Sequence, residues 1–418
     1  MECRVLSNGL RVVLIPKNLN TVAIVIASNR GSRTETVETN GIGHIIEHVI
    51  ARCSQKYPTI FDVEKVMDRV GGDYDPETTP DLIWWQISFH RRHLALAMDM
   101  IADNLLHPII SKEVVQREKG VILTEIANKS PDIHSLELLD GLIFKGHPLS
   151  FFPGGTAENI ERLSLRDVRN HWRRVIRANN LVFVAVGGFD EKKLFENVKE
   201  KLGSLRPGIP TPINPFLKTQ RRRRILFQTT PGEQAKVLVG ITTVKYGHRD
   251  RVPLKLISNI LGERTSSRLH TKLRDRGLVY RALSNCWHWF DTGCLYVQTA
   301  TRKEDIVEVV NTIVGELRDL CENLVSIEEI DLAKSNINAL VRESLDYPLS
   351  IARSYAGQLI AHGEIKNYRD YLTGINAVSR RRLREVARRR FKTNKLNLVV
   401  YGDTTPEIQR AVRETFHI

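Results

Sequence analysis

The sequence lacks any long hydrophobic run. Its longest apolar stretches, such as residues 22–27, have the length of a β-strand, whereas a membrane-spanning helix needs about 20 apolar residues. Residues 1–6 show no basic segment leading into an apolar core, so we expect no signal peptide. With 418 residues, of which 42% are hydrophobic and 26% charged, the chain has the composition of a globular protein with room for two or more domains.

Cysteine is also scarce. The five cysteines are odd in number, and none forms a Cys-x-x-Cys pair. We therefore expect reduced, mostly structural thiols, as is typical of a cytoplasmic protein.

Negative charge is in deficit, because the formal net charge is +14. Much of the excess lies in two arginine-rich segments, residues 221–224 and 380–390. Nucleic-acid binding is not favoured, because no zinc-finger, helix-turn-helix or aromatic-interleaved motif accompanies them. The excess could attract acidic peptides into a basic chamber. We favour the simplest interpretation, a solvated linker and a solvated helix face.

The segment Gly41–Glu125 carries the clearest chemical signal. It opens with His44-Ile45-Ile46-Glu47-His48, and on a helix His44 and His48 lie one turn apart on the same face. Two neutral imidazoles at this spacing suit a tetrahedral zinc site that needs a third protein ligand. Glu47 lies on the same flank, where a carboxylate could take a proton from a water molecule activated by the metal.

A later helix supplies the third ligand. Residues 111–128 are predicted to be helical, with Ser111 as a plausible N-cap, and they place Glu118 and Glu125 on the apolar stripe. A buried carboxylate is costly unless it is paired or binds a metal. We therefore predict Glu125 as the ligand and Glu118 as the outer partner that orients it.

This combination resembles the inverted zincins, the pitrilysin/insulinase family of metallopeptidases. The His-x-x-Glu-His order and the Glu-x6-Glu pair both match, and 76 residues lie between His48 and Glu125, as in the mitochondrial processing peptidase β-like branch. The resemblance implies that His44, His48 and Glu125 bind Zn2+. It also implies that Glu47 is the general base and Glu118 the supporting acid.

The chain repeats itself. Residues 164–187 align without gaps on residues 379–402, at a constant offset of 215. The repeat predicts an α+β fold of two duplicated halves, and the resemblance implies that each is a mostly antiparallel sheet packed with helices. We assign residues 1–205 to the catalytic zinc-binding half, 206–224 to a Pro/Arg-rich linker and 225–418 to the non-catalytic half.

Local patterns predict several elements in the first half. Residues 21–28 and 82–89 are predicted to be strands, and residues 60–70 and 94–106 are predicted to be helices. Residues 73–80 are predicted to form a turn-rich link.

Further residues are implicated by the resemblance alone. Asp75 stands near the position where the family carries a substrate-contacting Asn, so this contact departs from the family pattern. Arg274 and Tyr280 match an Arg and a Tyr that reach the substrate and the developing oxyanion in the family, although their spacing here is one residue shorter.

We therefore expect a zinc metalloendopeptidase that cleaves extended peptides or leader-type segments. The resemblance further implies a homodimer, or a heterodimer with a homologous subunit, in which two chains enclose the substrate. The alternative is a non-catalytic peptide-binding or assembly subunit of the same fold. The intact motif disfavours this alternative, because such subunits usually carry a broken one.

Overall fold

The computed structural model describes residues 2–209, 214–217 and 219–418. Residues 210–213 and 218 of the expected linker therefore lie outside the described residues. The chain forms two compact units, and neither is one continuous stretch. Of the described residues, the first unit comprises 2–128, 151–209, 214 and 343–365, and the second comprises the others.

The first unit is built on a six-stranded sheet in the order β1-β2-β6-β3-β5-β4. All neighbours pair antiparallel except β2 and β6. Its strands are β1 (Cys3–Val5), β2 (Arg11–Pro16), β3 (Thr21–Ser28), β4 (Asp73–Thr78), β5 (Ile83–His90) and β6 (Leu181–Gly187).

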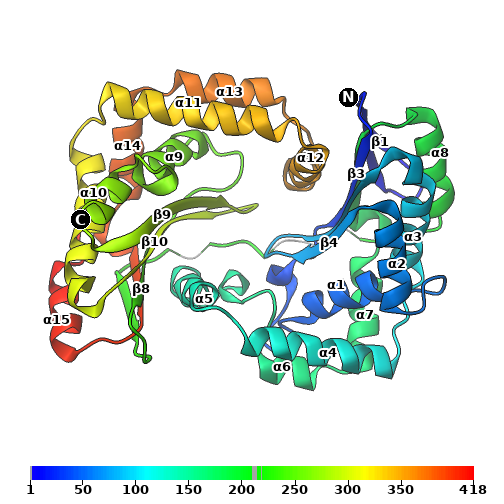
Figure 1. Cartoon of the computed structure of the whole chain (residues 1–418), viewed down its shortest axis with the longest axis horizontal. Coiled ribbons are helices and arrows are strands. Elements are labelled where there is room, and N and C mark those ends of the chain that lie inside the picture. Colours follow the sequence, from blue (N-terminus) through cyan, green and yellow to red (C-terminus); the bar gives the residue numbers. More distant parts are fainter. Residues whose placement is uncertain (1, 210–213, 218) are drawn as a thin grey trace. The chain divides into compact units, whose positions relative to one another are not determined.

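Helices cover both faces of this sheet. Alternate residues of β3 and β6, such as Ile24 and Phe183, lie in a core shared with the helices of the first half of the chain. The opposite face is covered by α12, which packs on β3 and β6 although it comes from the second half of the chain (Figure 1). The helices are α1 (Ile42–Arg52), α2 (Ile60–Val70), α3 (Leu94–Leu106), α4 (Lys112–Ala127), α6 (Ala157–Arg162), α7 (Leu165–Val175), α8 (Glu191–Leu202) and α12 (Pro348–His362).

The second unit repeats this plan with a five-stranded sheet in the order β7-β11-β8-β10-β9, in which only β7 and β11 are parallel. Its second face is covered by α5, a helix from the first half of the chain, which packs on β8 and β11. The strands are β7 (Arg224–Gln228), β8 (Ala235–Thr242), β9 (Val279–His288), β10 (Gly293–Thr301) and β11 (Leu396–Tyr401). The helices are α5 (Pro131–Ile143), α9 (Arg251–Ser258), α10 (Ile306–Glu322), α11 (Ile327–Ser344, whose last two residues belong to the first unit), α13 (Tyr368–Ala377), α14 (Arg380–Arg390) and α15 (Pro406–Thr415).

Short helical turns complete the described chain. The 3₁₀ turns are η1 (Ser32–Thr34), η2 (Arg91–His93), η3 (Pro148–Ser150), η4 (Ala178–Asn180), η7 (Lys303–Asp305) and η8 (Thr393–Lys395), and the π-helical turns are η5 (Asn259–Glu263) and η6 (His270–Arg274). Among the described residues, no helix combines the length and apolarity needed to cross a bilayer.

The predicted duplication is confirmed by equivalent elements. The offset of 215 residues relates α7 to α14, β6 to β11, and the start of α8 to that of α15. The sheet orders also correspond strand for strand once β1 is left out. The α+β fold class is therefore confirmed. The exchange of α5 and α12 between the units is a feature that the repeat does not reveal.

Residues 73–80 were wrongly expected to form a turn-rich link. Most of them form β4, the edge strand that pairs with β5 from Asp73 to Thr78. Pro76 is tolerated there because an edge strand needs hydrogen bonds from only one of its two sides. Strands of this composition escape pattern analysis, since Asp and Pro are depleted in strands generally.

The arginines of α14 are not simply a solvated face. Asp250 is fully buried, and its carboxylate accepts hydrogen bonds from Arg382 (2.7 Å), Arg389 (2.9 Å) and Arg390 (2.8 Å). Burial alone would raise the pKa of Asp250, but the hydrogen bond from Arg390 and the charges of Arg389 and Arg390 outweigh it and leave the pKa lowered. Part of the basic excess therefore holds α14 to the start of α9.

Replacing this buried acid tests the role of the arginines. We expect Asp250→Asn to lower the free energy of unfolding by about 2–3 kcal/mol, because charged hydrogen bonds are lost while the half-buried arginines can still reach solvent. Since the pKa is lowered, the difference should persist from pH 8 to pH 5 and shrink as the pH falls below 3.8, the ordinary value. Urea denaturation of the full chain measures it. Asp403→Asn, which breaks the exposed pair with Lys303, is the control and should change little.

Candidate metal and catalytic site

The motif helix α1 owes its orientation to its apolar face. Ile45, Ile46 and Val49 are fully buried in the core of the first unit. β-Branched residues are modest helix formers, so burial against α4 and α7 rather than intrinsic propensity stabilises this helix. The same burial turns His44 and His48 together towards α4.

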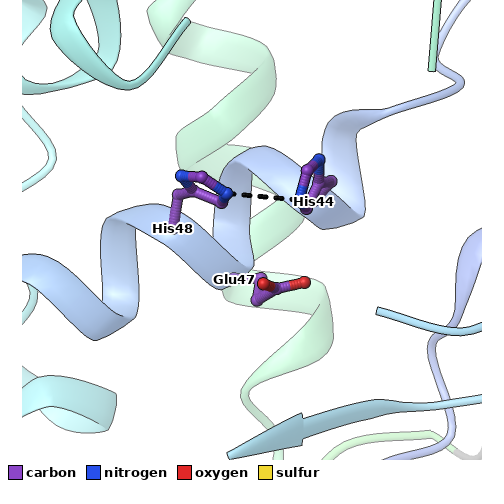
Figure 2. A group of neighbouring side chains, drawn as sticks. All are labelled: His44, Glu47 and His48. Carbon is purple, nitrogen blue, oxygen red and sulfur yellow. Dashed lines mark hydrogen bonds between the residues drawn. The ribbon is translucent and has the colours of Figure 1, made fainter. Parts of the chain in front are cut away.

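The two imidazoles face each other. Nε2 of His44 lies 3.2 Å from Nε2 of His48, and the rings are nearly perpendicular (Figure 2). Together with Glu47, they offer ligand atoms that all lie within 4.8 Å of one another. The spacing of the motif therefore produces the predicted cluster.

Helix α4 brings the two predicted acids to the same place. Ser111 caps the helix by accepting from the Val114 amide (3.2 Å), as expected. Oε2 of Glu125 lies 3.7 Å from Nε2 of both His44 and His48. Glu118 is 2% exposed, and its Oε2 lies 3.4 Å from Nδ1 of His48.

Glu118 fixes the tautomer of His48. Burial alone would raise the pKa of Glu118, but hydrogen bonds with His48 and Arg117 outweigh it and leave the pKa lowered, so the group is a carboxylate at neutral pH. A carboxylate accepts, so Nδ1 of His48 carries the proton. Nε2 then presents a lone pair towards His44 and Glu125, as a metal ligand must.

The donor set fits zinc. Neighbouring donor atoms lie roughly 3.4 Å apart in a tetrahedral site with metal–ligand distances of about 2.0–2.2 Å. The three separations among His44, His48 and Glu125 are 3.2, 3.7 and 3.7 Å. Two imidazole nitrogens and one carboxylate also form a ligand set typical of catalytic zinc.

Glu47 differs from the other acids by its burial. It is 6% exposed, and this burial raises its pKa to about 7, although the hydroxyl of Thr78 on β4 and the charge of His48 pull the pKa down. A general base is most effective when its pKa lies near the working pH. Its environment therefore suits proton transfer better than that of a surface carboxylate.

The remaining predicted residues belong to other elements. Asp75 is on the edge strand β4, and its Oδ2 accepts from Nε2 of Gln86 (2.8 Å). Arg274 and Tyr280 belong to the second unit, where the guanidinium lies 5.8 Å from the Tyr280 ring and bonds His270 (2.9 Å). Tyr280 is 83% exposed, so its side chain is available for contacts. The roles of these three residues stay predictions.

Glu35 is a residue that sequence reasoning missed. Its buried carboxylate accepts from the amides of Gly41 (2.9 Å) and Gly43 (2.8 Å) at the start of α1. Burial raises its pKa to about 7, although these amides and Asn40 lower it. The available signal was an acid shortly before a helix that has glycine, rather than Ser, Thr, Asp or Asn, at its N-cap.

Family models match both halves of the chain. The model described as Insulinase (Peptidase family M16) matches residues 11–150, and the model described as Peptidase M16 inactive domain matches residues 162–337. The first match contains all the predicted metal-binding residues. The second agrees with a second half that carries no His-x-x-Glu-His motif.

Relatives share most of their length with this chain. An uncharacterized zinc protease of Bacillus subtilis is 26% identical over 92% of this chain and 94% of its own. The mitochondrial-processing peptidase subunit beta of Caenorhabditis elegans is 22% identical over 96% and 89%. Relatives of this chain are named as zinc proteases, and zinc is the cofactor predicted for it.

Solved structures share the fold. A protease from Helicobacter pylori superposes with a TM-score of 0.90 at 22% identity, covering 96% of this chain and 99% of its own. A chain of complex III2 from Candida albicans superposes with a TM-score of 0.83 at 18% identity, covering 99% of both chains.

Removing a ligand tests the assignment. We expect near one zinc per wild-type chain by elemental analysis. Glu118→Gln, which removes an outer partner, should weaken zinc binding by about 10- to 100-fold. Glu125→Ala, which removes a ligand, should weaken zinc binding by more than this. Glu113→Ala, on the exposed first turn of α4, is the control and should retain zinc. Unchanged zinc content in Glu125→Ala would exclude Glu125 as a ligand.

Proposed function

Because this chain belongs to the insulinase (M16) family of peptidases, we propose that it is a zinc-dependent endopeptidase that cleaves extended peptides or leader-type segments. The observation that carries the proposal is the convergence of His44, His48 and Glu125 beside the buried carboxyl of Glu47. Two helices that packed together for purely structural reasons would not require two histidines and two acids at one place.

The residues divide the chemical work. His44, His48 and Glu125 would hold zinc, which when bound polarises a peptide carbonyl and lowers the pKa of a water molecule. Glu47 accepts the proton of the attacking water on its carboxylate and returns it to the nitrogen of the leaving amine. Glu118 keeps the proton of His48 on Nδ1, so that Nε2 stays a ligand.

Negative charge develops on the carbonyl oxygen during the attack. We assign its stabilisation to Tyr280 and Arg274, on the family resemblance. An exposed phenol and guanidinium could donate hydrogen bonds to such an oxygen. This assignment is part of the proposal and is independent of the zinc ligands.

The edge strand β4 is a suitable binding place for an extended peptide. It lies at the free edge of the first sheet and packs against α1, and Thr78 near its end lies beside Glu47. A peptide that adds a strand to this edge would place its backbone next to the site. Asp75 on the same strand would then contact substrate side chains.

Substitution of the base separates the enzyme from its alternative, a non-catalytic subunit. We expect Glu47→Gln to retain zinc and to lower kcat for peptide hydrolysis by about 10²- to 10⁴-fold, because the amide cannot take the proton. Cleavage of an unstructured peptide followed by mass spectrometry measures the loss. Glu64→Gln, an exposed acid of α2, should cleave normally. A non-catalytic subunit would show no hydrolysis in the wild type.

We further propose a homologous partner subunit, either a second copy or a sister chain. The C. elegans relative is named as a beta subunit, and the C. albicans structure is a complex. For a homodimer, we expect sedimentation to show a dimer and the activity per chain to fall on dilution as the dimer dissociates. An active monomer with constant activity per chain would contradict the shared arrangement.

A further inference from the structure

The start of α1 is held by a side chain from outside the helix. The first amides of a helix have no intrahelical partner, and the N-cap residue Gly41 has no side chain to supply one. Glu35, which directly follows η1, supplies both acceptors. Its Oε2 accepts from the amide of Gly41 at 2.9 Å, and its Oε1 accepts from the amide of Gly43 at 2.8 Å.

Burial makes this arrangement specific. Glu35 is only 5% exposed, so water does not replace these amides as hydrogen-bond donors to its oxygens. The side chain of Asn40 donates both to Glu35 (3.0 Å) and to the carbonyl of Phe152 (2.9 Å). The cap is thereby tied to the loop that precedes α6 as well as to α1.

Gly43 shows how tightly the carboxylate is seated. A Cβ at this position would lie 2.8 Å from Oε1 of Glu35, closer than Cβ atoms approach non-bonded atoms. The next neighbours, Ile83 and Thr78, would lie at 3.5 and 3.6 Å, which is ordinary contact. Glu35 is therefore the group that an added methyl would displace here, and the next residue is His44.

We propose that Glu35 is a positioning residue for the metal centre. By fixing the backbone on both sides of Ile42 and immediately before His44, it sets where Nε2 of His44 lies relative to His48. Losing the carboxylate frees the first turn of α1 while the buried face of the helix still holds His48. The inference rests on the proposed function, since it concerns the metal site of the peptidase.

The test is a double-mutant cycle on zinc affinity, measured by competition with a chelator. We expect Glu35→Ala to weaken zinc binding at least tenfold, with Glu35→Gln in between because its amide keeps one acceptor oxygen. Gly43→Ala should also weaken binding in the wild-type background, because the added methyl displaces Oε1. In the Glu35→Ala background the same substitution should cost much less, because the obstructing oxygen is gone.

Thr59→Ala is the matched control. Thr59 caps α2 by accepting from the Asp62 amide (3.2 Å), and α2 carries no predicted ligand. It should lower thermal stability without changing zinc affinity. Glu35 variants that behave like Thr59→Ala, or additive effects of Glu35→Ala and Gly43→Ala, would overturn the positioning role.

A metal-independent measurement separates this inference from the proposed function. Amide hydrogen exchange in the chelator-treated protein should quicken at Gly43 and His44 in Glu35→Ala and stay unchanged there in Thr59→Ala. Unchanged exchange in Glu35→Ala would overturn the inference by itself. A wild type that binds no zinc but shows the expected exchange would overturn the proposed function and leave the Glu35 cap established.

Discussion

Burial of the apolar face of α1 is the interaction on which the site depends. Each fully buried aliphatic side chain, such as Ile45 or Ile46, contributes about 1.5–3 kcal/mol. This burial keeps α1 helical although its sequence is rich in β-branched residues. It also fixes the rotation of α1 about its axis, and therefore which side of the helix faces α4. His44 and His48 therefore converge because the core fixes the rotation of the helix, and the polar contacts of Glu118 and Glu35 then refine what packing has set.

The clustering of the predicted ligands was predictable because its signals are local. One helical turn relates the two histidines, and two turns of α4 relate Glu118 to Glu125. The expected apolar stripe holds for Glu118, which is buried, but not for Glu125, which is exposed. The duplication was predictable for the same reason, since a constant offset needs no knowledge of contacts. In both cases the physical cause is a spacing along the chain.

The features that were missed depend on partners distant in sequence. The covering of the first sheet by α12 uses Arg353, which bonds Gln86 (3.0 Å) across more than half of the chain, and no local pattern indicates it. Strand β4 exists because β5 offers it a partner, not because its residues favour strands. The same holds for the two buried acids. The fold, and no local sequence pattern, determines that Glu35 binds two helix amides and that Asp250 binds three arginines.

The duplicated halves show that the fold does not impose the chemistry. Each unit places a buried acid ahead of the helix that follows its central strand, but the two acids act differently. Glu35 binds the amides of its own helix, whereas Asp250, the residue before α9, binds arginines from α14. Helix α9 buries Leu256 and Ile257 and carries no histidine. The buried acid of the second unit thus belongs to a charge cluster, whereas that of the first unit caps the helix that carries the two histidines.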